Sequence, residues 1–219
     1  DLREYQDRLG AALVAALSSA RVPRVVALSS VGAHLDEGTG PILGLHDLET
    51  RLGMLKDAEV VSLRPAYFME NLLWSAPLIR NQGINGSPIR ADVPLPMVAT
   101  EDIAAVAARL FIDGIFHGHS VRYLLGPRDL TMTEATRILG EAIGKPDLRY
   151  VQFSEDDARR ALADAGMSAS VIEAMLEMQR GFNAGSIRPT RARSAENTTP
   201  TTLEVFSKTA FAHAYRVAA

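Results

Sequence analysis

The sequence predicts an α/β protein with a parallel sheet, and the order of its early elements carries this prediction. Residues 25–28 form a short continuous apolar run, and residues 59–65 form a second strand-like run that Pro65 closes. Such runs are typical of strands buried on both faces of a sheet. Between them, residues 43–55 place leucines at helical spacing. A strand, a crossover helix and a strand joined by short junctions indicate a parallel pair with a right-handed connection.

The composition is that of a folded chain with no strong bias in charge. Of the 219 residues, 47% are hydrophobic and 22% are charged, and the formal net charge is −3. These values exclude a disordered tail, a collagen-like chain and a coiled-coil rod. A nearly neutral chain has no electrostatic footprint for nucleic acid or for an anionic membrane, so we expect a small-molecule substrate. Cysteine is absent, which excludes disulfides and zinc–sulfur sites and favours a cytoplasmic location.

Helical spacing also opens the chain, and a loop-rich stretch lies in its middle. Apolar residues recur at intervals of three and four over residues 1–20, which predicts a helix. Residues 67–80 predict a short amphipathic helix cut by Pro77. Residues 81–96 are rich in Gly, Pro and Asn, which predicts a loop that covers part of the molecule.

The second half of the chain predicts mainly helices. Thr100 is expected to cap a helix over residues 101–112, because acidic residues follow it in the first turn. The other predicted helices are 133–143, 154–165, a helix from 168 or 170 to 179, and 203–217. The predicted strands are 121–125 and 149–153, and residues 186–202 are expected to be irregular.

Two segments are expected to carry the chemistry, because each follows a strand of the parallel pair. In an open parallel sheet, ligands bind beyond the carboxyl ends of the strands, where the crossover loops diverge. Residues 29–33 have small side chains that permit the close approach of a ring or a sugar. In residues 64–71, Pro65 bends the chain, and aromatic and amide side chains follow. Aromatic residues after a strand are also common in cores, so that alternative stays open at each position.

These segments also resemble a known family. The residues that carry the resemblance are VVALSSVGA over 25–33, GTGP over 38–41, HDLE over 46–49 and LRPAYFMENLL over 63–73. They look like the NmrA-like group of atypical short-chain dehydrogenase/reductase proteins, and the resemblance continues more loosely through residues 133–185. It implies an α/β fold with an incomplete Rossmann-like parallel sheet and a smaller α-rich C-terminal lobe that closes a substrate cleft. Family members include quinone and azo reductases and non-enzymatic redox-sensing regulators.

The strand-end segments and the resemblance together define the candidate site residues, with NADP(H) or NAD(H) as the implied cofactor. The candidates for cofactor binding are Ser29, Ser30, Val31, Gly32, His46, Pro65, Ala66, Tyr67 and Phe68. The candidates for substrate binding are Tyr67, Phe68 and Asn71.

The helix over residues 43–55 departs from the usual reductase pattern. Typical short-chain reductases use a tyrosine with a lysine four residues later, because the ammonium group lowers the pKa of the phenol that protonates the carbonyl. Here the helix carries His46 and Glu49 on one face. His46 is the candidate catalytic residue, as a proton donor or a contact to the nicotinamide ribose. The alternative is a capping or surface histidine beside a solvated acid. The other histidines lack the spacing of metal ligands, so no metal is expected.

The second departure concerns the phosphates of the cofactor. A dinucleotide is usually held by a Gly-rich turn between a first strand and a first helix, and this chain has no such turn. By comparison with the family, part of the Rossmann domain is expected to precede Asp1. We therefore expect residues 1–125 to be the C-terminal part of a Rossmann-type dinucleotide-binding domain. Residues 126–219 are expected to form the substrate lobe, partly interleaved with the first domain.

The resemblance implies an NAD(P)H-dependent oxidoreductase that transfers hydride to a small quinone-like or carbonyl acceptor. The missing tyrosine–lysine pair favours a quinone, which needs less acid assistance than a ketone. Two alternatives stay open. One is a non-catalytic NAD(P)-binding redox-sensing regulator with a protein partner, and the other is a chain that binds no dinucleotide.

Overall fold

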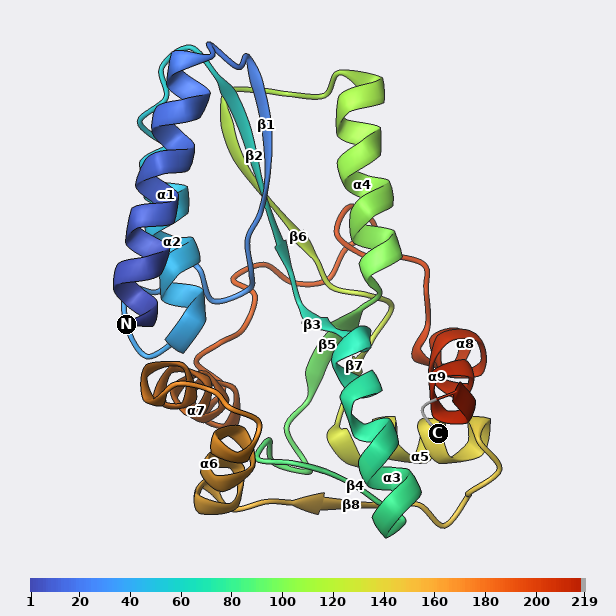
Figure 1. Ribbon diagram of the computed structural model, residues 1–219. Helices are drawn as coiled ribbons and strands as arrows, with labels where there is room; N and C mark the ends of the chain where they lie inside the picture. Colours follow the sequence, from blue (N-terminus) through green and yellow to red (C-terminus); the bar gives the residue numbers. More distant parts are fainter. Residues whose placement is uncertain (218–219) are drawn as a thin grey trace. The chain divides into compact units, whose positions relative to one another are not determined.

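The computed structural model describes residues 1–217, and helices and strands alternate along it (Figure 1). The contacts within the chain divide it into two compact units. The first unit is made of residues 1–65, 104–123 and 159–192, and the second is made of residues 66–103, 124–158 and the chain from 193 onward. Each unit therefore draws on separate stretches of sequence. The expected division between residues 125 and 126 stays a prediction.

The first unit is built on a three-stranded sheet with the order β1-β2-β6. Its strands are β1 (Arg24–Leu28), β2 (Glu59–Pro65) and β6 (His119–Leu124), whose last residue belongs to the second unit. β1 pairs with β2 in parallel, from Arg24 opposite Glu59 to Leu28 opposite Leu63. β2 lies in the middle, and Leu63 is buried there. The predicted α/β class with a parallel sheet is confirmed.

Helices flank this sheet. α1 (Leu2–Ser19) and α2 (Leu43–Leu52) lie side by side next to it, and most of α4 (Thr100–Asp113) lies on its other side (Figure 1). α7 (Ala169–Ala184) and the second half of α6 (Glu155–Asp164) also belong to this unit. Part of the core is a cluster made of the buried Leu52, Leu55, Ala58 and Val60 and the partly buried Val14, Leu17, Val25, Ala27 and Leu48. Val14 and Leu17 of α1 and Leu48 and Leu52 of α2 thus supply side chains to this core, whereas Tyr5, Leu9 and Leu13 of the apolar stripe predicted for α1 are exposed.

The turn that leads into α2 needs a glycine. The 3-10 turn η1 (Gly40–Ile42) directly precedes α2, and Gly40 has a φ of +56°. A Cβ atom on Gly40 would lie 1.9 Å from the carbonyl oxygen of Ala174 in α7. Glycine alone tolerates both this backbone conformation and so close an approach. Gly40 therefore lets α7 pack directly on η1, the turn that precedes α2.

The second unit contains two small sheets. The first has the order β3-β5-β7, where β3 (Tyr67–Phe68) is parallel to β5 (Leu95–Val98) and β5 is antiparallel to β7 (Asp129–Leu130). The second is the parallel pair of β4 (Ile84–Ser87) and β8 (Arg149–Gln152). Its helices are η2 (Met69–Ser75), α3 (Ala76–Gln82), α5 (Met132–Ala142), α8 (Leu203–Phe206), the π-helical turn η3 (Ser207–Phe211) and α9 (Ala212–Val217).

Local capping chemistry explains where α5 begins. Thr131 and Glu134 form a capping box, in which each side chain accepts a hydrogen bond from the other residue's backbone N–H. The hydrogen bonds from the Thr131 backbone and hydroxyl group lower the pKa of Glu134. The predicted helix over 133–143 is confirmed to within a residue at each end.

The prediction for residues 67–96 is wrong in two places. Residues 67–80 do not form one helix, because β3 and the 3-10 helix η2 come first and Pro77 lies in the opening turn of α3. A proline there removes an N–H that has no helical partner, so it starts a helix rather than cutting one. Residues 81–96 contain β4 and the start of β5. A Cβ on Gly86 in β4 would lie 2.4 Å from the Phe153 ring. Close packing therefore overrides the weak strand propensity of this stretch.

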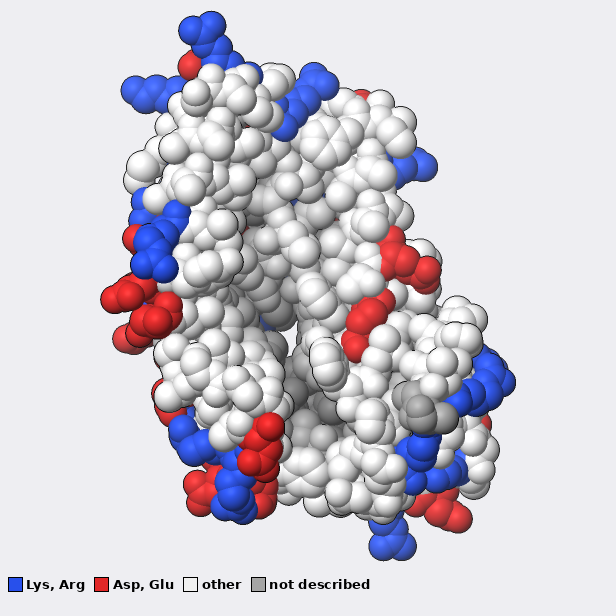
Figure 2. Space-filling model, in the orientation of Figure 1, with Lys and Arg blue, Asp and Glu red and all other residues white. Residues whose placement is uncertain are grey.

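Charges of both signs are mixed on the molecular face in Figure 2. Lys and Arg side chains lie among Asp and Glu side chains around the edges of that face. Within residues 1–217, no helix combines the length and the apolar character needed to cross a membrane.

Replacing Leu52 by alanine should destabilise the first unit strongly. Leu52 is 1% exposed in the core between the helices and the sheet, and Leu→Ala in such a site costs about 2–5 kcal/mol. Leu9→Ala on α1 is the matched control, because Leu9 is 55% exposed and a surface change usually costs less than about 0.5 kcal/mol. The measurement is the free energy of unfolding in urea. Equal losses in the two variants would contradict this description of the core.

Candidate functional site

The segment after β1 continues to pair with β2 beyond the end of the strand. The Ser29 N–H donates to the Leu63 carbonyl at 2.7 Å, and the Val31 N–H donates to the Pro65 carbonyl at 3.0 Å. These bonds hold Ser29, Ser30 and Val31 alongside the last residues of β2. The structure therefore brings these three candidates together with Pro65 at the carboxyl ends of two parallel strands.

The same segment then turns back on itself. The Ala33 N–H donates to the Ser30 carbonyl at 3.2 Å, and the Leu35 N–H donates to the Gly32 carbonyl at 2.9 Å. Gly32 has a φ of +88°, and a Cβ atom there would lie 3.0 Å from Cγ2 of the buried Ile187. A glycine is therefore required at this turn for its backbone conformation, and a side chain would also press on Ile187.

His46 holds this segment from α2. Its Nδ1 lies 3.0 Å from the Ala33 carbonyl oxygen. A carbonyl oxygen can only accept, so Nδ1 carries the proton and, in the neutral ring, Nε2 keeps a lone pair. His46 is partly buried and lies inside α2 rather than at its cap. Its catalytic role stays a prediction.

Glu49, three residues further along α2, is in a nearly buried ion pair. The Glu49 and Arg64 side chains are 13% and 12% exposed. Arg64 Nε donates to Glu49 Oε1 at 2.9 Å, and Nη2 donates to Oε2 at 2.6 Å. The Ser29 hydroxyl also donates to Glu49 Oε1. The alternative that Glu49 is a solvated acid is therefore wrong.

The guanidinium of Arg64 also contacts Tyr123 on β6. Arg64 Nη1 donates to the Tyr123 hydroxyl at 3.1 Å, and the guanidinium carbon lies 5.8 Å from the centre of the tyrosine ring. Burial opposes the charge on Arg64, but the hydrogen bonds with Glu49 and Tyr123 outweigh it and raise the pKa of Arg64. The Tyr123 hydroxyl lies 3.0 Å from that of Thr190. Tyr123 is only 4% exposed, which makes it a poor proton donor to a bound substrate.

His34 lies near the same ion pair. Burial first, and then the positive charge of Arg64, lower the pKa of His34, while Glu49 opposes this shift. Nδ1 of His34 is buried and has no hydrogen-bond partner within residues 1–217. The imidazole is therefore kept neutral more firmly than in an exposed histidine.

The remaining candidates belong to the second unit. The Ala66 N–H donates to the Leu124 carbonyl, and Tyr67 and Phe68 form β3. Burial, followed by the effect of the nearby Tyr150, raises the pKa of Tyr67 far above its ordinary value. Asn71 is exposed in η2.

Glu70, which lies between Phe68 and Asn71 in the sequence, has a structural role. Its carboxylate accepts from the Thr100 backbone N–H at 2.9 Å and from the Thr100 hydroxyl at 2.6 Å. It thus satisfies a free N–H at the start of α4. Thr100 is the first residue of that helix, at the position where a cap was predicted.

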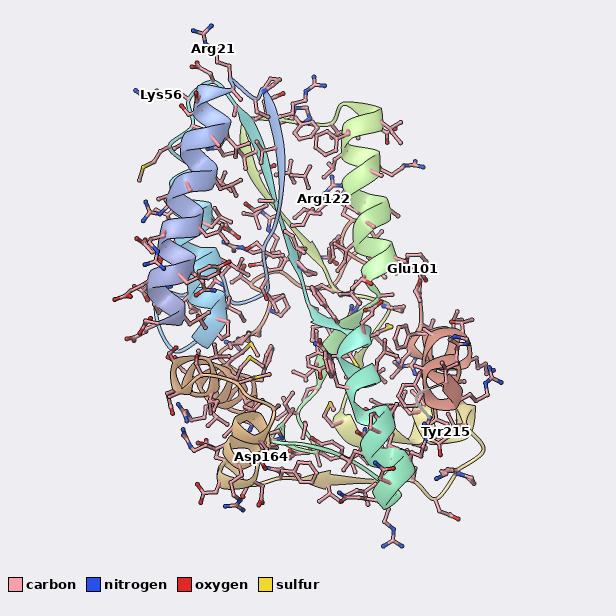
Figure 3. All side chains as sticks on the ribbon, viewed as in Figure 1. Arg21, Lys56, Glu101, Arg122, Asp164 and Tyr215 are labelled. Atoms are coloured by element: carbon pink, nitrogen blue, oxygen red, sulfur yellow. The ribbon has the colours of Figure 1, made fainter. Side chains whose placement is uncertain are left out.

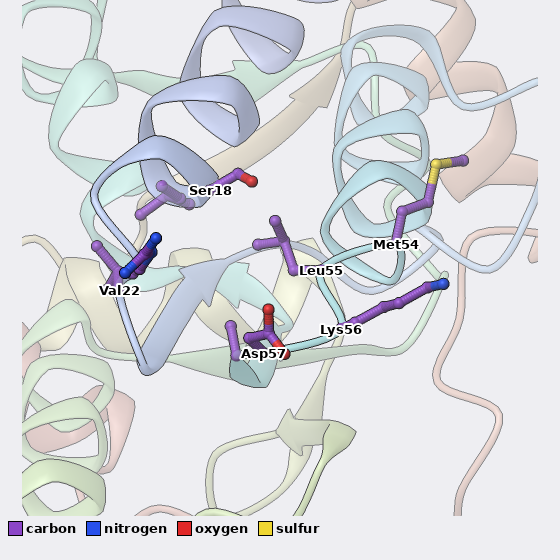
Figure 4. A pocket seen from close by; sticks show the side chains of 9 residues that line it. Ser18, Val22, Met54, Leu55, Lys56 and Asp57 are labelled. Atoms are coloured by element: carbon purple, nitrogen blue, oxygen red, sulfur yellow. The ribbon is translucent and has the colours of Figure 1, made fainter.

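A cavity of about 260 Å³ lies at the opposite end of the first unit's strands (Figure 4). It is lined by the end of α1 and by residues 54–58, which precede β2. Figure 3 labels Arg21 and Lys56 from this region. Ligand pockets usually have about 300–1,000 Å³ and, in parallel sheets, lie beyond the carboxyl ends of strands. This cavity is therefore a weaker candidate for a ligand site than the strand-end segments. Within residues 1–217, no group of three or more His, Asp or Glu side chains could hold a metal ion.

Comparison with known proteins assigns this architecture to a family. The sequence pattern of the NmrA-like family matches residues 4–207. The chain belongs to the NmrA-like family. This confirms the resemblance that was drawn from the strand-end segments.

Two curated relatives are reductases. An NAD(P)H azoreductase of Xenophilus azovorans is 30% identical over 175 residues, which are 79% of this chain and 59% of that protein. A (4-alkanoyl-5-oxo-2,5-dihydrofuran-3-yl)methyl phosphate reductase of Streptomyces griseus is 36% identical over 131 residues, which are 58% of this chain and 45% of that protein. The chain thus spans about half the length of these curated relatives.

Solved structures confirm the Rossmann-like fold. The NADPH-dependent quinone oxidoreductase QOR2 of Escherichia coli, complexed with NADPH, matches with a TM-score of 0.74 at 24% identity, over 89% of this chain and 68% of that chain. The negative transcriptional regulator NmrA in complex with NAD matches with a TM-score of 0.63 at 14% identity, over 90% of this chain and 67% of that chain. At these identities the likeness shows the fold alone.

Sequence reasoning placed Arg64 in the second strand-end segment but gave it no role, and it missed Tyr123 and His34 as neighbours of the candidate site. A signal for Arg64 was present, because an arginine near the end of a buried strand needs an acidic partner. Glu49 is the acid that the helix pattern placed nearby. Nothing in the sequence indicated that Tyr123 would lie beside them, since β6 is about 60 residues away along the chain.

Replacing His34 by glutamine should remove part of the acid sensitivity of the fold. The pKa of His34 is lower in the folded chain than in the unfolded chain, so the unfolded chain binds the proton first as the pH falls. Stability linked to His34 is therefore complete above about pH 6.5 and declines below it.

The measurement is the free energy of unfolding in urea at about pH 7.5 and about pH 5.5, on either side of the ordinary histidine pKa. The wild type should lose more stability between them than His34→Gln. His117→Gln, on the surface, is the matched control and should behave as the wild type. A wild-type loss in His34→Gln would refute the assignment.

Proposed function

We propose that this chain forms part of an NAD(P)H-dependent oxidoreductase that passes hydride to a small quinone-like acceptor. The observation that carries the proposal is the segment from Ser29 to Ala33, which runs beside Pro65 at the carboxyl ends of β1 and β2. This is where open parallel sheets bind their ligands. Membership of the NmrA-like family supports the choice of cofactor and reaction class.

The groups on this segment suit a dinucleotide. The Ser30 hydroxyl is partly exposed, and its side chain makes no hydrogen bond within residues 1–217. Nε2 of His46 keeps a lone pair, because Nδ1 donates to the Ala33 carbonyl. In our proposal, Ser30 donates to or accepts from the cofactor, and His46 accepts from a hydroxyl group such as that of the ribose. Gly32 keeps the turn free of a side chain.

The choice of a quinone as the acceptor rests on the side chains near this segment that could protonate a carbonyl. α2 has neither tyrosine nor lysine, and Tyr123 is buried beside Arg64. The cofactor supplies the hydride when it is bound, and water supplies the proton that completes the hydroquinone. A carbonyl acceptor would need a placed acid during hydride transfer, which makes it the weaker candidate.

The names of the relatives agree with this reaction class. The azoreductase and the quinone oxidoreductase are both named as users of NADPH or NAD(P)H. The NmrA regulator, complexed with NAD, keeps open the alternative of a redox-sensing protein without turnover. An assay that separates binding from turnover decides between them.

The 219-residue chain should bind NADPH or NADH and oxidise it in the presence of quinones. The measurements are calorimetric titration with each dinucleotide and the loss of NADPH absorbance with a series of quinones. Binding without quinone-dependent oxidation would refute the enzyme and favour the regulator. No binding of either dinucleotide would refute the proposal for this chain.

Ser30→Ala should weaken NADPH binding by roughly threefold to tenfold, because the net worth of one neutral hydrogen bond is about 0.5–1.5 kcal/mol. Ser186→Ala is the matched control, since Ser186 is an exposed serine of the same unit that bonds to the Gly181 carbonyl. The dissociation constants of both variants are measured by the same titration. An unchanged affinity in Ser30→Ala would remove Ser30 from the site.

A further inference from the structure

The ion pair of Glu49 and Arg64 is costly for its position, which suggests a task besides stability. Both side chains are almost buried, and removing two charges from water offsets much of their mutual attraction. An apolar pair of similar volume is often as stable or more stable. The pair is therefore better explained by the residues that it holds in place than by its contribution to stability.

The carboxylate of Glu49 holds the segment after β1. The Ser29 hydroxyl donates to Glu49 Oε1, and Ser29 itself is 5% exposed. His46 bonds to the Ala33 carbonyl four residues later. Glu49 and His46 are three residues apart on α2 and share a face. One face of α2 thus forms hydrogen bonds with the segment at two residues, Ser29 and Ala33.

The guanidinium of Arg64 connects these contacts of α2 to a second segment of the same unit. Arg64 bonds to Tyr123, whose hydroxyl pairs with Thr190. Ile187, three residues before Thr190, packs where a side chain on Gly32 would be. Residues 187–190 and residues 29–35 are therefore joined both by packing and through the ion pair.

We propose that Glu49, oriented by Arg64, is the positioning residue of the segment from Ser29 to Leu35. The consequence for cofactor binding rests on the proposed function, whereas the ordering of the segment does not. Only a carboxylate fits this task well. It accepts two hydrogen bonds from Arg64 and a third from Ser29, whereas an amide would turn an NH₂ group toward one of these donors.

Ser29→Ala tests the proposal without breaking the ion pair. It removes the hydroxyl that Glu49 holds and leaves Arg64 paired. Amide hydrogen exchange of Val31, Ala33 and Leu35 should become faster by roughly tenfold or more, as expected for the loss of a hydrogen bond to a charged group. The Val60 amide, bonded to Gly118 at the other end of β2, should exchange as in the wild type.

Ser154→Ala is the matched control. Ser154 also donates to a carboxylate, that of Asp157, but at an exposed site in the second unit. It should leave the exchange of residues 31–35 unchanged. Glu49→Gln should accelerate exchange over 31–35 at least as much as Ser29→Ala, and the double variant should add little, because both changes break one network. Wild-type exchange over residues 31–35 in Ser29→Ala would overturn the proposal.

A second readout links the segment to the cofactor. In Ser29→Ala, the dissociation constant for NADPH should rise by roughly threefold to tenfold. If the wild type binds no NADPH, the proposed function fails, and the exchange measurement alone decides the positioning role. Faster exchange with an unchanged NADPH affinity would keep the ordering role and refute its consequence for the cofactor.

Discussion

The parallel pairing of β1 with β2 is the constraint on which the first unit depends. In parallel strands the carboxyl ends meet at one edge, so whatever follows β1 lies beside the end of β2. The ladder extends past Leu28, since Ser29 and Val31 still bond to Leu63 and Pro65. A single register thereby places the hydroxyls after β1 next to the end of β2, where Arg64 lies. The positions of the candidate groups in this unit follow from that register and from α2, which packs over it.

A buried cation in the middle strand then determines the local electrostatics. Arg64 needs an acid, and Glu49 reaches it from α2 with both carboxylate oxygens. Burial is the main cause of the lowered pKa of His34, and the two members of the pair act on it in opposite directions, because Arg64 lowers that pKa further while Glu49 opposes the shift. Tyr123 receives a hydrogen bond from the same guanidinium. The charges at this edge of the sheet thus depend on Arg64 and its partners and not on a charged surface. This agrees with the nearly neutral composition of the chain.

The sequence predicted elements whose signal is local and missed those decided by distant contacts. The helix over residues 1–20 was predicted from its own periodicity and the strand over 59–65 from its own strand-like run closed by Pro65, and both are confirmed. β4 has no such signal, because Gly86 is in a strand only where the Phe153 ring takes the space of its missing side chain. The same holds for the site. The face shared by His46 and Glu49 follows from helical spacing, whereas the partner of Glu49 depends on how α2 packs over β2.

The role of α2 bears on how chemistry is divided between protein and cofactor. In reductases that protonate a carbonyl, the corresponding helix supplies an acid that must reach the substrate. Here two of the side chains that α2 turns toward the strand ends are engaged with the protein itself, since His46 bonds to Ala33 and Glu49 bonds to Arg64 and Ser29. The Glu49 carboxylate accepts three hydrogen bonds from Arg64 and Ser29, so both of its oxygens are engaged within the protein. Under the proposed function, a helix used in this way would fix the geometry around the hydride donor, and it would suit an acceptor that needs only one proton from water besides the hydride.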